Sequence, residues 1–79
     1  MQARVRVELR KAVLDPAGEA VKASLGQLGF EGVRGVRIGK VIDIELDDMP
    51  RVEAEARVRE MAEKLLANPV IEDFTVEVL

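Results

Sequence analysis

Few residues of this chain have the chemistry that catalysis usually requires. The sequence contains no His, Cys or Tyr, so the commonest proton-transfer group and the readiest nucleophile are absent. Its one serine, Ser24, falls on the apolar side of a predicted helix, and the chain has no histidine to act as its base. We therefore interpret Ser24 as a small packing residue and expect this chain to have no catalytic residue.

Two pairs of charged residues are the remaining candidates for ion binding. Asp47 and Asp48 offer the oxygen ligands that divalent cations prefer. The Pro50 that follows them favours the simpler reading, in which both carboxylates stabilise the positive end of a helix dipole. Arg37 and Lys40 lie near a predicted turn and suit an anion, although exposed charges of this kind are usually only solvated. The glycines around them do not stand between a strand and a helix, so no phosphate-binding loop is predicted.

Composition narrows the class of partner. The formal net charge is −3 and the only aromatic residues are Phe30 and Phe74, which disfavours nucleic-acid binding. No apolar run approaches the roughly 20 residues needed to span a bilayer, and the N-terminus has no signal-peptide core. We therefore expect a cytoplasmic protein that has neither a membrane nor a nucleic acid as partner.

Length and composition together favour association with other chains. The 79 residues correspond to a single domain, 1–79, whose core must be small because its surface-to-volume ratio is poor. Domains of this size are commonly reinforced by disulfides, by a metal or by association. The absence of Cys and His leaves association as the reinforcement that the sequence allows, with no metal site expected.

The first elements follow from the hydrophobic pattern. Apolar and charged residues alternate over residues 3–10, which predicts a strand with one apolar face. Asp15 and Pro16 then suit the N-cap and the first position of a helix that we expect to run from about 16 to 28. Gly29 is placed to end that helix in a left-handed conformation. A half-buried strand is therefore followed directly by a helix that can cover it.

A hairpin is predicted in the middle of the chain. We expect a second strand at 34–38, a type II′ turn at Gly39 and Lys40, and a third strand at 41–46. The glycine inside the second strand weakens that prediction, because glycine is unfavourable within strands.

The predicted fold is α+β. Pro50 begins a second helix, the Asn68-Pro69 pair ends it, and a fourth strand follows. The order strand, helix, strand, strand, helix, strand favours a βαββαβ two-layer sandwich related to the ferredoxin-like fold. Its antiparallel sheet has the order 4-1-3-2, with two helices on one face. The residues expected to share the core are Val5, Val7, Leu9, Leu25, Ile42, Ile44, Val58, Met61, Leu65, Phe74 and Val76.

Three stretches carry a resemblance to a known family. They are VLDPAG at 13–18, VRIGK at 36–40 and KLLANPVIE at 64–72. In this order and in a chain this short, they resemble PurS, the small subunit of phosphoribosylformylglycinamidine synthase. The resemblance covers the whole chain, and LLANPVIE is its most specific part. The chain departs from the family at Ala12, where the family often has glycine, and at Ala17, where it often has glutamine.

The resemblance implies a non-catalytic role in de novo purine synthesis. The family's complex converts formylglycinamide ribonucleotide, ATP and glutamine into the amidine. The small subunit would bridge a glutaminase (PurQ-type) and a synthetase (PurL-type) as a homodimer or tetramer. It would bind no cofactor itself, since ATP and Mg are used by the synthetase. The candidate interface residues are Arg37 and Lys40 on the hairpin, Asp15 and Asn68 at the helix ends, and Arg4, Arg6 and Glu45 on the outer sheet face.

Two alternatives remain open at this point. An amino-acid-sensing regulatory module of ferredoxin-like topology would bind its ligand near the first turn and helix, and equilibrium dialysis with amino acids separates it from a scaffold. An acylphosphatase-like enzyme would need an arginine in a phosphate-binding loop and a nearby asparagine. The only asparagine is Asn68, at the end of a predicted helix, which disfavours this second alternative.

Overall fold

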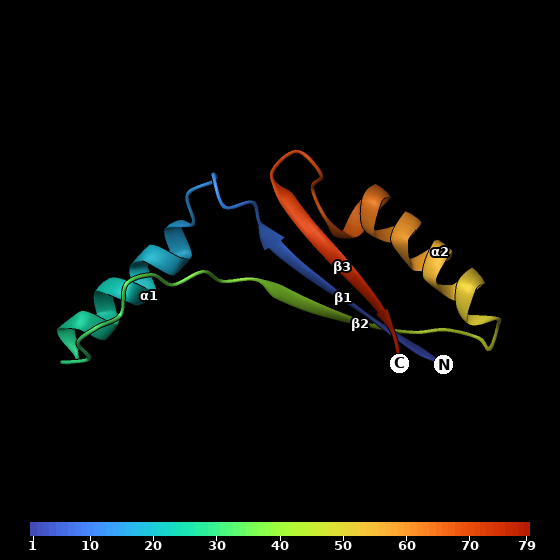
Figure 1. The fold of residues 1–79 in the computed structure, drawn as a ribbon, viewed down its shortest axis with the longest axis horizontal. Coiled ribbons are helices and arrows are strands. Elements are labelled where there is room, and N and C mark those ends of the chain that lie inside the picture. Colours follow the sequence, from blue (N-terminus) through green and yellow to red (C-terminus); the bar gives the residue numbers. More distant parts are fainter.

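A three-stranded antiparallel sheet forms the centre of the molecule in the computed structural model, which describes residues 1–79. The strands are β1 (Gln2–Leu9), β2 (Lys40–Glu45) and β3 (Glu72–Val78). Their spatial order is β2-β1-β3, so the strand that begins the chain lies between the two others (Figure 1). This is the arrangement predicted for the first, third and fourth strands.

Two helices accompany the sheet, but only one covers it. They are α1 (Pro16–Gln27) and α2 (Arg51–Met61), and α2 continues into a π-helical turn, η1 (Ala62–Leu66). The predicted α+β class with an antiparallel sheet and two helices is confirmed. α2 packs on β1 and β3, whereas α1 extends away from one end of the sheet (Figure 1). The second helix position over the sheet is therefore left open.

The core lies between α2 and the inner face of the sheet. Ala3, Val5 and Val7 of β1 are buried, and the alternating residues of that strand face the other side. From α2, Ala54 and Val58 are buried one helical turn apart. The residues packed around this centre are Ile42, Ile44, Leu46, Leu66, Phe74 and Val76. The predicted inner faces of these strands are confirmed.

The predicted hairpin is wrong. Residues 30–39 form no strand, and the chain runs along α1 and then straight into β2 (Figure 1). A type II′ turn needs positive φ at its first central residue, and the only residues with positive φ are Gly29 and Gly32. Without a turn at Gly39, the expected second strand at 34–38 cannot lie beside β2. Gly39 serves a different need, because a Cβ there would approach the carbonyl oxygen of Val7 to 2.7 Å.

The π-helical turn changes which residues are buried at the end of α2, and the predicted burial there is wrong. The N–H of Ala67 donates to the carbonyl oxygen of Ala62 at 2.9 Å, which closes a wider turn than an α-helix makes. The extra residue rotates the helix face, so that Leu66 packs against the core while Leu65 is 83% exposed. Met61, also predicted as core, is 37% exposed. Leu25 lies on α1, outside the sheet core.

We call residues 16–39, which include α1, the arm. With the arm extended, the molecule measures 49 × 24 × 15 Å and its radius of gyration is 16.0 Å. A compact chain of this length has a radius of gyration of about 12 Å. Most of the excess length comes from the arm (Figure 1). No helix is both long and apolar enough to cross a membrane.

Candidate interaction site

The side chain of Asp15 connects the beginning of the arm to its end. Its side chain accepts a hydrogen bond from the N–H of Gly18 at 2.9 Å, which is the N-cap that the sequence predicts. The second carboxylate oxygen accepts from the N–H of Ile38 at 2.7 Å, across 23 positions in the sequence. These two hydrogen bonds, that from Ile38 first, lower the pKa of Asp15 below its ordinary value. One buried carboxylate therefore fixes the start of α1 against the non-strand segment that leads into β2.

A close backbone contact lies beside this carboxylate. A Cβ at position 18 would overlap the carbonyl oxygen of Val36, so only glycine lets the first turn of α1 approach the returning chain. This explains why VLDPAG and VRIGK, two of the stretches on which the resemblance rests, lie side by side. The sequence predicted Asp15 as a helix cap. It did not predict the hydrogen bond from Ile38, because no local pattern encodes a contact across 23 positions.

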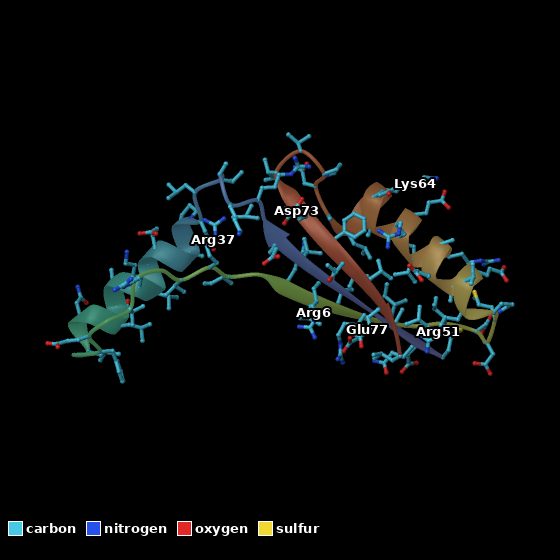
Figure 2. All side chains as sticks on the ribbon, in the orientation of Figure 1. Arg6, Arg37, Arg51, Lys64, Asp73 and Glu77 are labelled. Carbon is cyan, nitrogen blue, oxygen red and sulfur yellow. The ribbon has the colours of Figure 1, made fainter.

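Arg10 joins the base of the arm to the loop before β3. Its backbone N–H donates to the carbonyl oxygen of Ile71 at 2.9 Å, and its guanidinium donates to the carbonyl oxygen of Pro69. The guanidinium of Arg37 in turn donates to the carbonyl oxygen of Arg10 at 2.9 Å. Figure 2 shows Arg37 between α1 and the sheet. The third stretch of the resemblance therefore meets the first two at this end of the sheet, through an arginine that the sequence analysis missed.

The loop at Asn68 is held by its own hydrogen bonds. The side-chain oxygen of Asn68 accepts from the N–H of Val70 at 3.1 Å, and its backbone N–H donates to Glu72 at 2.7 Å. Asn68 thus shapes a local turn, and its side chain is not directed at another element. Val70 is 78% exposed on this turn, which leaves an apolar side chain at the surface.

The outer face of the sheet carries paired charges. Arg4 donates to Asp43 at 2.8 Å across β1 and β2, and this contact lowers the pKa of Asp43 and raises that of Arg4. In the register of the sheet, Arg4 also lies opposite Glu77 of β3. Arg6 and Glu45 lie on the same face but not beside each other, because Arg6 is opposite Val41 and Glu45 is opposite Gln2. An exposed ion pair such as Arg4–Asp43 contributes little to stability.

The structure separates the predicted interface residues into three places. Asp15 and Arg37 meet at the base of the arm, while Asn68 shapes the nearby loop. Lys40 is the first residue of β2, and by the alternation of the strand it lies on the same face as Ile42. Arg4, Arg6 and Glu45 form the outer-face group. Asp47 and Asp48 belong to no group of three or more acidic residues suited to a metal.

Fold and site together define a class of protein: a small α+β domain with an extended arm and an exposed, charged outer sheet face. A family model described as "PurS: Phosphoribosylformylglycinamidine (FGAM) synthase" matches residues 2–79. The chain belongs to the PurS family, as the resemblance indicated.

Relatives and solved structures agree with this assignment. The chain is 47% identical over 75 residues to the phosphoribosylformylglycinamidine synthase subunit PurS of Synechocystis, covering 95% of this chain and 75% of that one. It is 46% identical over 76 residues to the subunit of Archaeoglobus fulgidus, covering 96% and 95%. Its fold matches a structure of Bacillus subtilis PurS with a TM-score of 0.85 and 42% identity, covering 96% and 94% of the two chains. A chain in the structure of PurLQS from Thermotoga maritima matches with a TM-score of 0.88 and 32% identity, covering 99% and 95%.

Proposed function

We propose that this chain is the non-catalytic subunit that bridges the glutaminase and the synthetase of phosphoribosylformylglycinamidine synthase in de novo purine synthesis. The observation that carries the proposal is the family match over residues 2–79. The chemistry of the chain agrees with it, because a subunit that only positions others needs no nucleophile or base of its own. ATP and Mg would be used by the synthetase, and the complex would act in the cytoplasm.

The bridging role needs at least two contact surfaces. A chain that resembles this one occurs in the structure named PurLQS, which supports PurQ-type and PurL-type subunits as partners. The arm and the outer sheet face are separate surfaces on this chain, so they can serve different contacts. We further propose that the chain acts as a homodimer or tetramer, since its small core and extended shape favour association.

The direct test is reconstitution with the glutaminase and synthetase subunits of the same source. We expect no turnover by the chain alone and a strict requirement for it in glutamine-dependent amidine formation. Ammonia-dependent synthesis by the large subunit should suffer less, because it does not need the glutaminase. Equal glutamine-dependent rates with and without the chain would refute the bridging role.

The double variant Arg37→Ala, Lys40→Ala tests where partners bind. Both side chains are exposed, so we expect the variant to fold, and to assemble poorly with its partners because charge pairs set partner choice and association rate. Arg57→Ala is the matched control, since Arg57 is a surface arginine on α2 whose partner Glu53 lies in the same helix.

Full glutamine-dependent activity of the folded double variant over a range of salt concentrations would exclude these two residues as the contact. The contact would then be sought at Arg4, Arg6 and Glu45 on the outer sheet face. The single variants separate the two positions, because Arg37 also holds the backbone of Arg10 and Lys40 does not.

A further inference from the structure

Backbone hydrogen bonds identify which residues of β3 face its free edge. In antiparallel strands, residue pairs that exchange backbone hydrogen bonds alternate with pairs that do not. At one end of the β1–β3 ladder, the N–H of Leu79 donates to the carbonyl oxygen of Gln2 at 2.9 Å. At the other end, the N–H of Arg10 donates to the carbonyl oxygen of Ile71 at 2.9 Å. Every second position between these ends is bonded to β1, so residues 73, 75 and 77 belong to the ladder and the backbone groups of 74 and 76 point to the free edge.

Both ends of this free edge are closed, whereas its middle is open. At the C-terminal end, the guanidinium of Arg51 donates to the carbonyl oxygen of Val78 at 2.7 Å. At the N-terminal end, the N–H of Glu72 donates to the carbonyl oxygen of Asn68 at 2.8 Å. The edge groups between them have no partner, since β3 has no strand on this side. A strand edge with free donors and acceptors is a template for pairing with another extended chain.

The charges of β3 disfavour a second copy on this edge. Asp73 and Glu77 lie near the two ends of the strand (Figure 2), on its outer face, with the uncharged Thr75 between them. The antiparallel pairing that uses the full length of two such strands is centred on Thr75. It places Asp73 of each copy opposite Glu77 of the other, and like charges directly opposite each other destabilise a sheet. A strand of different chemistry is therefore needed to fill the edge.

Neither of these carboxylates has a close counter-ion within the chain. The carboxylate of Asp73 lies 3.6 Å from the Nε of Arg10, which is too long for a hydrogen bond, and its side chain is 67% exposed. Glu77 is opposite Arg4 in the register but forms no ion pair, since Arg4 donates to Asp43 at 2.8 Å. An incoming strand with a cation opposite each carboxylate is therefore favoured by the cross-strand rule that disfavours self-pairing.

We propose that the free edge of β3 binds an extended segment of a partner subunit, which adds a strand to the sheet through the backbone of Phe74 and Val76. This inference rests on the proposed bridging function and specifies one of its contact surfaces. The segment carries Lys or Arg at two positions four residues apart, opposite Asp73 and Glu77, and an uncharged residue midway between them. Its alternate residues are apolar, because they lie beside Phe74 and Val76 on the side that α2 covers. Backbone hydrogen bonds supply the affinity of such a contact, and the side chains supply its specificity.

Amide hydrogen exchange locates the contact directly. Exchange is measured by mass spectrometry with residue-level fragmentation, in the chain alone and in the complex reconstituted with the glutaminase and the synthetase. We expect the amides of Phe74 and Val76 to exchange at least about tenfold more slowly in the complex, because they gain a hydrogen-bond partner. The amides of residues 73, 75 and 77 are the internal reference, since they are already bonded to β1.

Val76→Pro removes one donor from the free edge and keeps an apolar side chain. The β1 ladder does not use the N–H of Val76, and proline is found on edge strands in this orientation. Val76→Ala is the matched control, because it shortens the side chain and keeps the N–H. We expect Val76→Pro to bind its partner subunit about tenfold more weakly than Val76→Ala, through the loss of one hydrogen bond.

A charge reversal tests the same edge without changing the backbone, and it decides the matter if Val76→Pro does not fold. Asp73→Lys, Glu77→Lys places cations where the incoming segment carries its own, so we expect weaker assembly. Glu31→Lys, Glu63→Lys is the matched control, since it makes the same change in net charge at two exposed positions away from β3.

The outcomes separate this inference from the bridging function. Unchanged exchange at Phe74 and Val76 in an assembled, active complex would overturn the inference and leave the bridging role intact. Equal assembly of the charge reversal and its control would do the same. Slow exchange at these amides in the chain alone, increasing with its concentration, would assign the edge to a second copy and also overturn the inference. A wild-type chain that assembles with neither subunit would overturn both the inference and the bridging role.

Discussion

At the scale of single residues, Asp15 connects two separate segments of the backbone. A carboxylate has two acceptor oxygens, and here each accepts from a different backbone segment, Gly18 in α1 and Ile38 before β2. An amide in the same place has only one acceptor oxygen. Asp15→Asn should therefore lose one of these two contacts and lower the melting temperature by ~5 °C. Asp47→Asn is the control, because it changes a solvent-exposed carboxylate by the same chemistry.

The same group predicts a pH dependence. Because hydrogen bonds lower the pKa of Asp15 in the folded state, its stabilising effect is complete above the unfolded pKa of about 3.9. The effect is lost as the pH falls through the lower folded-state pKa. Melting curves from neutral pH to about pH 2 should show the wild type and Asp15→Asn converging at the acid end. A constant difference between them at every pH would show that the carboxylate charge is not what stabilises the junction.

At the scale of elements, the π-helical turn decides which of two adjacent leucines belongs to the core. Leu66 packs against the core while Leu65 is 83% exposed. Leu66→Ala should lower the free energy of unfolding by ~2 kcal/mol, and Leu65→Ala should change it by less than about 0.5 kcal/mol. Urea unfolding of the two variants measures this difference. The opposite ranking would mean that α2 continues as a regular α-helix and that the simple helical spacing is correct.

The elements also show how much of the fold could be predicted from the sequence. Local patterns were sufficient for β1, for α1 with its cap at Asp15, and for the left-handed end of α1 at Gly29. They failed at 34–38, because a strand forms only beside a partner strand and the local pattern does not say whether one is present. They also failed at Leu65, because one extra residue in a helical turn shifts the face without changing the composition.

The candidate site was only partly predictable for a related reason. Asp15 was identified as a cap, yet its contact with Ile38 depends on how the arm returns to the sheet. Arg10 gave no signal at all, since its contacts with Pro69 and Ile71 join opposite ends of the sequence. The resemblance identified the stretches that matter. The structure adds that they converge at one end of the sheet, where the arm begins.

At the scale of the whole molecule, the central fact is that the chain is too extended for its size. A radius of gyration of 16.0 Å, against about 12 Å for a compact chain, leaves the arm with little apolar cover of its own. Folding and association should then be linked. The melting temperature of the wild type should rise with protein concentration, because an assembled state is stabilised by mass action.

Val21→Asp tests this linkage on the exposed apolar side of α1. Val21 is 39% exposed in the single chain, so a carboxylate there remains solvated in a monomer but would be buried without a partner between two copies. We expect the variant to sediment as a monomer and to lose the concentration dependence of its melting temperature. Val70→Asp is the matched control, since Val70 is 78% exposed on the loop before β3 and lies outside α1. This variant should remain assembled. If Val21→Asp stays assembled with an unchanged concentration dependence, the surface that joins the copies lies elsewhere on the chain.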